Sequence, residues 1–305
     1  MSFLARREAV AARAKQRFDW MPVWLVAPAG LLMTGLLIYP IIQGILLSFF
    51  DTRILNYARG KFIGLAIYER LFVDPYFWNA VRVTFLYGAG VMICTYVAGL
   101  CFALLLNRSF PGRGLIRMLF ILPWAIPEVV AVLIFVWMLD AQFGIINYAL
   151  VSAGLIEAPL AWLSSRELAL PALILVTTWQ QMPLAMLILL AGLQTIPREE
   201  YEAAMVDGAN AWSRFLHVTM PGLRAVNVVL VLLLILNSFR RVTMIYAMTG
   251  GGPARSTETL SILTYNTAFD YQRIGYAAAI GTALLVILLI FSLIYYVTLL
   301  RKRSA

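Results

Sequence analysis

The stretch from Arg198 to Pro221, REEYEAAMVDGANAWSRFLHVTMP, separates two long apolar blocks of the chain. It is polar, rich in helix-forming residues, and carries the only histidine, His217. The flanking blocks, residues 168–193 and 223–248, are each long enough to cross a bilayer, which takes roughly 20 residues at 1.5 Å each. The stretch is therefore a connection between two predicted membrane spans.

The whole chain follows this pattern of apolar blocks. Of its 305 residues, 62% are hydrophobic and only 13% are charged. Such a composition predicts an all-α polytopic membrane protein. Ala27-Pro28-Ala29 resembles a signal cleavage site, but the apolar run continues well beyond it, which favours a retained first span. Six transmembrane helices are predicted, at residues 23–50, 80–106, 115–139, 168–193, 223–248 and 276–300.

Three parts follow from these spans. Residues 1–22 form a basic, weakly amphipathic amino terminus, which we expect to lie as a helix on the membrane surface. Residues 23–300 form the six-helix transmembrane domain, including the loop 195–221. Residues 301–305 form a basic tail.

Several chemistries are disfavoured by what the chain contains. The net charge of +9 arises from basic residues that flank the spans, so it indicates membrane topology rather than nucleic-acid binding. One histidine cannot build a multi-histidine metal site. No phosphate-binding loop and no nucleophile elbow occur. We therefore predict that the chain is not an enzyme, has no catalytic, metal or cofactor site, and leaves any ATP hydrolysis to another chain.

The basic residues also predict the orientation of the chain. With six spans, fourteen of them fall on one side of the membrane: Arg6, Arg7, Arg13, Lys15, Arg17, Arg108, Arg113, Arg117, Arg198, Arg214, Arg224, Arg301, Lys302 and Arg303. The excess of Lys and Arg on the cytoplasmic side of membrane proteins then places both termini in the cytoplasm. The stretch 198–221 is cytoplasmic on the same argument.

The stretch itself predicts two short helices with a turn between them. Pro197 and the acids after it suit the start of a helix. Tyr201, Ala204 and Met205 mark its apolar side, Gly208 permits a turn with positive φ, and a second helix runs over residues 210–217. An amphipathic helix lying on lipid is one interpretation. Acids, small residues and a central glycine favour the other, which is docking into a groove of a cytoplasmic partner.

The spacing of this stretch closely resembles a known motif. Glu202-Ala203-Ala204, three residues, Gly208, nine residues and Val218-Thr219-Met220-Pro221 are similar to the EAA motif of ABC importer permeases. Further segments resemble the carbohydrate-uptake branch of that family, the maltose, trehalose and glycerol-phosphate type. They are residues 62–65 with Tyr68, Trp179 with Pro183, residues 248–253, Phe269, and residues 275–277.

This resemblance implies a fold and a set of partners. The fold would be that of a type I ABC importer permease with a cytoplasmic coupling helix, in the inner or plasma membrane. The partners would be a second homologous permease, an ATP-binding subunit dimer that binds ATP and Mg, an extracytoplasmic solute-binding protein, the sugar and membrane lipids. The residues that couple to the ATPase would be Glu202, Ala203, Ala204, Asp207 and Gly208.

Polar residues deep in the spans predict the substrate path, because such residues are costly in a membrane and usually face a cavity. Pro123 and Pro127 should break the third span just before Glu128, which is one of these polar residues. Asn237, Ser238 and Arg241 are spaced to share one helix face. For each group an alternative to the substrate path stays open. Glu128 could instead form a structural ion pair with an arginine. Gln180 and Gln181 could instead make ordinary hydrogen bonds between helices. The candidate path residues are Glu128, Gln180, Gln181, Asn237, Ser238 and Arg241.

Other classes of function remain as alternatives. A self-sufficient secondary transporter or channel would need a coupling-ion site and usually internal repeats, and neither is evident. A membrane enzyme would need a catalytic cluster at the surface. Within the importer reading the particular sugar stays open, and Arg240 and Arg241 keep an anionic cargo such as glycerol phosphate possible. The family often has an aspartate soon after the Phe-Arg pair of the fifth span. This chain has Arg241-Val242-Thr243 at that place instead.

Overall fold

The computed structural model describes residues 21–299, and its contacts divide the chain after Leu47 into two compact units. The predicted surface helix of residues 1–20 and the basic tail 301–305 lie outside the described residues. The first unit holds α2 (Met21–Met33), the π-helical turn η1 (Thr34–Ile38) and α3 (Tyr39–Leu47). Together they include an apolar helix of 24 residues, Trp24–Leu47, that is long enough to span a membrane.

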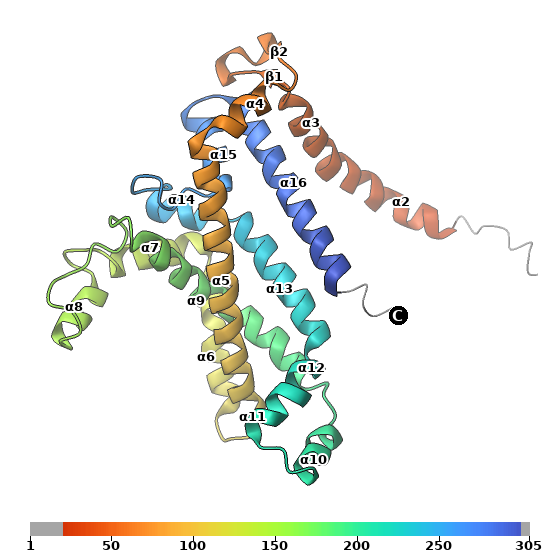
Figure 1. Ribbon diagram of the computed structural model, residues 1–305, viewed down its shortest axis with the longest axis vertical. Helices are drawn as coiled ribbons and strands as arrows, with labels where there is room; N and C mark the ends of the chain where they lie inside the picture. Colours follow the sequence, from red (N-terminus) through yellow and green to blue (C-terminus); the bar gives the residue numbers. More distant parts are fainter. Residues whose placement is uncertain (1–20, 300–305) are drawn as a thin grey trace, which may run out of the picture. The chain divides into compact units, whose positions relative to one another are not determined.

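The second unit is also almost entirely helical (Figure 1). Its membrane-length helices are α5 (Pro75–Asn107), α9 (Ala169–Leu193) and α16 (Ile274–Leu299). The remaining elements are β1 (Phe50–Asp51), η2 (Ile54–Arg59), β2 (Lys61–Phe62), α4 (Ala66–Val73), α6 (Arg113–Ala125), α7 (Glu128–Met138), α8 (Ile145–Ser152), α10 (Arg198–Val206), α11 (Ala211–Arg214), η3 (Phe215–Thr219), α12 (Met220–Gly222), α13 (Arg224–Phe239), α14 (Thr243–Thr249), α15 (Leu260–Tyr265) and η4 (Asn266–Asp270).

Helices α5 and α9 pack along each other and form the centre of this unit (Figure 1). Asp74 begins α5 by accepting a hydrogen bond from the backbone N–H of Tyr76, and Pro75 occupies the first turn, where its missing N–H costs nothing. At Gly99 a Cβ atom would lie 2.9 Å from the Cβ of Ala185 and 3.1 Å from the backbone N of Met186. Only glycine therefore allows the two helices to approach this closely.

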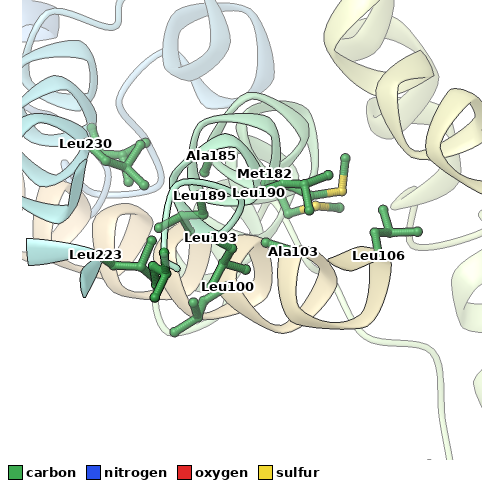
Figure 2. Packing of buried hydrophobic residues seen from close by; sticks show 13 residues of the cluster. Leu100, Ala103, Leu106, Met182, Ala185, Leu189, Leu190, Leu193, Leu223 and Leu230 are labelled. Atoms are coloured by element: carbon green, nitrogen blue, oxygen red, sulfur yellow. The ribbon is translucent and has the colours of Figure 1, made fainter. Parts of the chain in front are cut away.

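Buried leucine, alanine and methionine side chains fill the space between these helices and α13 (Figure 2). Leu100 and Ala103 come from α5, Met186 and Leu189 from α9, and Leu230 from α13. Because lipid tails are as apolar as leucine, such close packing, rather than exclusion of water, holds membrane helices together. This cluster extends toward the end of the unit that carries the loop 195–221.

The broken third span is confirmed. Helix α6 ends at Ala125 and α7 begins at Glu128, with an angle of 95° between them. Pro127 explains the break, because the residue before a proline avoids helical geometry and Ile126 is extended; Pro123, which was also expected to break the span, lies inside α6. Four helices are long and apolar enough to cross a membrane, and the number rises to six if each bent pair is one span. The all-α polytopic fold with up to six spans is therefore as predicted.

The fifth span differs from its prediction. Residues 223–248 were expected as one helix, but α13 ends at Phe239 and a new short helix, α14, begins at Thr243. Arg241 lies in the break between them, where its side chain turns away to bind Glu128. The pairing of this charge is the physical reason for the interruption, because an arginine inside an apolar helix would otherwise lack a partner.

The two ends of the second unit carry different structures (Figure 1). Helices α10, α11 and α12 gather at one end, and the β1–β2 hairpin, α4 and α15 lie at the opposite end. At that opposite end a glycine-rich turn follows α14, with positive φ at Gly250 and Gly251. Arg255 fixes this turn, because it pairs with Glu258 at 2.8 Å and lies 3.9 Å from the ring centroid of Tyr76.

Burial alone would lower the pKa of the Arg255 guanidinium. The opposite effect of the Glu258 carboxylate, of the hydrogen bond to it and of nearby tyrosines is larger, so the pKa is above its usual value. The arginine therefore keeps its positive charge at physiological pH.

Candidate functional site: the loop 195–221 and the polar cluster

The loop 195–221 forms the predicted pair of helices with a turn between them. Helix α10 follows Pro197 and has Glu199 and Glu200 in its first turn, where the helix dipole favours acids. Gly208 has a φ of +80°, which is the left-handed conformation that glycine adopts without strain. Asn210 then begins α11, since its side-chain oxygen accepts a hydrogen bond of 2.8 Å from the N–H of Ser213.

One side of this loop is fixed to the membrane helices. The hydroxyl groups of Tyr201 and Thr219 are hydrogen-bonded at 3.0 Å, and Thr219 is buried. Ile196, Val218 and Met220 pack into the hydrophobic cluster between α5, α9 and α13. Packing and one side-chain hydrogen bond therefore attach the loop to the helices that lead into the membrane.

The opposite side of the loop is exposed. Met205 was expected on the packed side with Tyr201 and Ala204, but it is 50% exposed and Val206 is 88% exposed. These two adjacent apolar side chains therefore lie on the same exposed loop as the acids. All but one of the five predicted coupling residues are exposed, and Ala204 is half-buried; the five are Glu202, Ala203, Ala204, Asp207 and Gly208.

His217 has a local role. Its ring Nδ1 lies 2.9 Å from the backbone oxygen of Ser213, one turn earlier in the chain, and the side chain is exposed. Within residues 21–299 no group of three or more histidine, cysteine, aspartate or glutamate side chains is placed to hold a metal ion.

A second group of functional candidates meets where the two broken spans come together. The Nη1 atom of Arg241 lies 2.8 Å from Oε1 of Glu128 and 2.9 Å from Oε1 of Gln180. The same glutamate oxygen accepts a hydrogen bond of 3.1 Å from the backbone N–H of Met244. We call these four residues the polar cluster. It joins the start of α7, the middle of α9 and the start of α14.

Glu128 therefore lies at the break between α6 and α7 and also bonds to the helix that follows the break after α13. It sits at the first residue of α7, and it also satisfies one of the free N–H groups at the start of α14, which has no side-chain cap of its own. The side chains of Arg241 and Glu128 are 15% and 31% exposed. The ion pair that the sequence left open is thus present, and both of its members still reach open space.

The other candidate path residues are not part of this cluster. Ser238 is 1% exposed and its hydroxyl donates to the backbone oxygen of Leu234. Asn237 accepts a bond of 3.2 Å from Nη2 of Arg240. Because α13 ends at Phe239, the expected common face of Asn237, Ser238 and Arg241 does not form. Gln181 is buried, and its Nε2 atom has no hydrogen-bond partner among residues 21–299.

Of two aromatic residues near the candidate path residues, one is buried in the core and one lines a pocket. Phe239 is 3% exposed and packs edge-on against Phe85, so it is closed off from a solute. Trp179 remains available. It lines an open pocket of about 450 Å³, together with Phe120, Pro123 and Met182.

One functional contact was missed from the sequence, and one difference between two named residues could not be derived from it. The contact is made by the backbone N–H of Met244, which no residue pattern marks as a ligand for a glutamate 116 positions away. The difference concerns Arg240, whose setting differs from that of Arg241 although the two are adjacent. A charged residue inside a predicted span marked both arginines as functional candidates. Their different partners became evident only from the structure, in which α13 ends at Phe239.

Comparison with known proteins agrees with this geometry. Residues 76–304 match the model of the family described as binding-protein-dependent transport system inner membrane component. The sulfoquinovosyl glycerol transport system permease protein SmoG of Agrobacterium fabrum is 33% identical over 279 residues, covering 90% of this chain and 89% of that protein. The trehalose/maltose transport system permease protein MalF of Thermococcus litoralis is 34% identical, covering 77% and 78%.

A solved structure has the same fold. A chain of a bacterial ABC transporter involved in the import of the acidic polysaccharide alginate superimposes with a TM-score of 0.79 at 22% identity, covering 93% of this chain and 96% of that one. The chain thus belongs to the inner-membrane components of binding-protein-dependent transport systems. It is a multi-pass permease subunit with the fold of a type I ABC importer permease.

Proposed function

We propose that this permease, with a second homologous permease, forms the path of an ATP-driven importer for a carbohydrate. The exposed residues of the loop 195–221 carry this proposal, because they present small, acidic and apolar groups on a support that is packed into the membrane helices. Two ATP-binding subunits would bind ATP and Mg, and an extracytoplasmic binding protein would deliver the cargo. This chain itself performs no chemistry.

In this proposal α10 is the coupling helix. Glu202, Ala203, Ala204, Asp207 and Gly208 dock into a cleft of the ATP-binding subunit, and both termini lie in the cytoplasm, as the positive charges favour. Closure of the ATPase pair pushes on α10. The bond between Tyr201 and Thr219 and the packing of Val218 and Met220 pass this movement to α13.

A carbohydrate cargo is supported by the relatives, whose names include sulfoquinovosyl glycerol and trehalose/maltose. The candidate path residues supply donors and acceptors of the kind that hydroxyl groups use. The Arg241 guanidinium and the amide of Gln180 lie at the break in the spans, and the buried Nε2 of Gln181 has no hydrogen-bond partner among residues 21–299. Trp179 offers a ring face in the adjacent pocket, which suits stacking of a sugar.

A substitution at Gly208 tests the coupling role. Its Cβ would meet nothing within 4 Å, so Gly208→Asp costs only the backbone strain of a positive φ, about 1–2 kcal/mol, and adds a charge to the docking surface. The complex should still insert in the membrane. We expect ATP hydrolysis to lose its dependence on the loaded binding protein, and uptake in proteoliposomes to fall.

Gly112→Asp is the matched control. Gly112 has a φ of +79° and an equally empty surrounding, but it lies in the connection between α5 and α6, outside the loop 195–221. We expect near-normal uptake with this control. Normal uptake by Gly208→Asp would contradict the coupling role. Uptake by this chain alone, without ATP, would instead favour a secondary transporter.

A further inference from the structure

The two adjacent arginines at the end of α13 have different charge environments. Arg241 is neutralised by Glu128 at 2.8 Å and bound by Gln180 at 2.9 Å. Arg240 is exposed, and its bonds go to two neutral oxygens: Nη2 to Oδ1 of Asn237 at 3.2 Å, and Nε to the backbone oxygen of Leu236 at 3.4 Å. Neither of the two ion pairs found within residues 21–299 includes Arg240.

Arg240 also lies at the end of an apolar helix of a predicted membrane span. Helix α13 has 16 residues, so at 1.5 Å per residue it places Arg240 about 24 Å from the end that carries the loop 195–221. The hydrocarbon core is about 30 Å thick, and charged groups inside it pair or face a water-filled cavity. Its place at the carboxyl end of a helix favours a cation slightly, but the helix dipole does not supply a full counter-charge.

The side of α13 that carries Arg240 is unoccupied in the second unit. Val229 and Leu233 are 55% and 42% exposed, and Asn237 and Arg240 follow on the same side at intervals of four and three residues. The stripe is apolar toward the loop 195–221 and polar at its other end. Its polar end therefore presents an oriented guanidinium to a space outside the packed core.

We propose that Arg240, oriented by Asn237, binds an anionic group of the cargo, so that the importer carries an acidic sugar. This inference rests on the proposed function and names the class of its substrate. A guanidinium has five N–H donors in a planar fork, and only two are used within residues 21–299. The free edge matches a carboxylate, sulfonate or phosphate, which two parallel bonds can hold.

The test uses the complete complex of both permeases, the ATP-binding subunits and the binding protein in proteoliposomes. Uptake is measured for a uronate-containing, a sulfonated and a phosphorylated sugar, each against its neutral counterpart. We expect at least one acidic sugar to be carried in preference to the neutral one. Arg240→Gln should slow its uptake about tenfold or more, as loss of a charged hydrogen bond predicts. Arg240→Lys should restore part of the rate.

Arg82→Gln is the control, since Arg82 is also an exposed arginine without an ion-pair partner within residues 21–299. It lies on α5, seven residues after Pro75, and not on the stripe of α13 that carries Arg240. Its loss should leave the preference for the acidic sugar unchanged. A purely structural role of Arg240 would slow acidic and neutral sugars alike.

Three results overturn the inference. The first is uptake of neutral sugars alone, and the second is normal uptake of the acidic sugar by Arg240→Gln. The third is loss of the second permease from the purified Arg240→Gln complex, which would show that a carboxylate of that subunit is the counter-charge. Failure of the proposed function looks different: the assembled complex then hydrolyses ATP but takes up no sugar of either kind.

Discussion

The ion pair between Glu128 and Arg241 gives the most quantitative prediction. Removing one member of a buried pair usually costs 3–5 kcal/mol, because the other charge is left without a partner. Here the side chains are 15% and 31% exposed, so water screens part of this cost, and we expect about 2 kcal/mol for either Glu128→Gln or Arg241→Gln. The double variant, which leaves no uncompensated charge, should recover about half of that loss.

Thermal unfolding of the purified complex in detergent measures the effect. At 2–4 °C per kcal/mol, each single variant should lower Tm by about 4–8 °C, and the double variant by less than either. A coupling energy of about 3 kcal/mol from the double-mutant cycle would confirm the pair. Arg224→Gln, an exposed arginine at the other end of α13, should leave Tm unchanged.

The same variants separate the two roles considered for Glu128. Unchanged uptake with a lower Tm would show a structural pair only. Reduced uptake by Glu128→Gln at temperatures well below its Tm would place the carboxylate in the substrate path. A double variant less stable than both singles, or singles with wild-type Tm, would refute the reasoning from compensation of charge.

Two further substitutions test the packing that supports the site. Tyr201→Phe removes the hydroxyl bond to Thr219 and should cost about 1 kcal/mol; we expect fewer sugars imported per ATP hydrolysed, and normal coupling would contradict transmission through this bond. Gly99→Leu forces a side chain against Ala185 and should destabilise by about 1–3 kcal/mol or more through overpacking, read as a lower Tm. Gly114→Leu, at a helical glycine with nothing within 4 Å, is its control.

Much of the architecture was predictable because the membrane restricts what a chain can do. A bilayer requires about 20 apolar residues per span and allows no unsatisfied backbone, so apolar blocks become helices. Proline chemistry predicted the break before Glu128, and glycine chemistry predicted the turn at Gly208. The spacing from Glu202 to Pro221 resembles the family motif, and the comparison with the family model confirms that the chain belongs to this family.

Tertiary structure alone decided how the polar residues are shared. Periodicity placed Asn237, Ser238 and Arg241 on one helix face, because a sequence pattern assumes that the helix continues. The helix stops at Phe239, since Arg241 gains more from Glu128 and Gln180 than it would from an apolar helix interior. The ion pair joins Arg241 to Glu128, which lies 113 residues earlier in the chain, and neutralises Arg241. The neighbouring Arg240 is exposed. Local sequence determines which segments are helical, but a contact between distant segments determines which charge is left for a ligand.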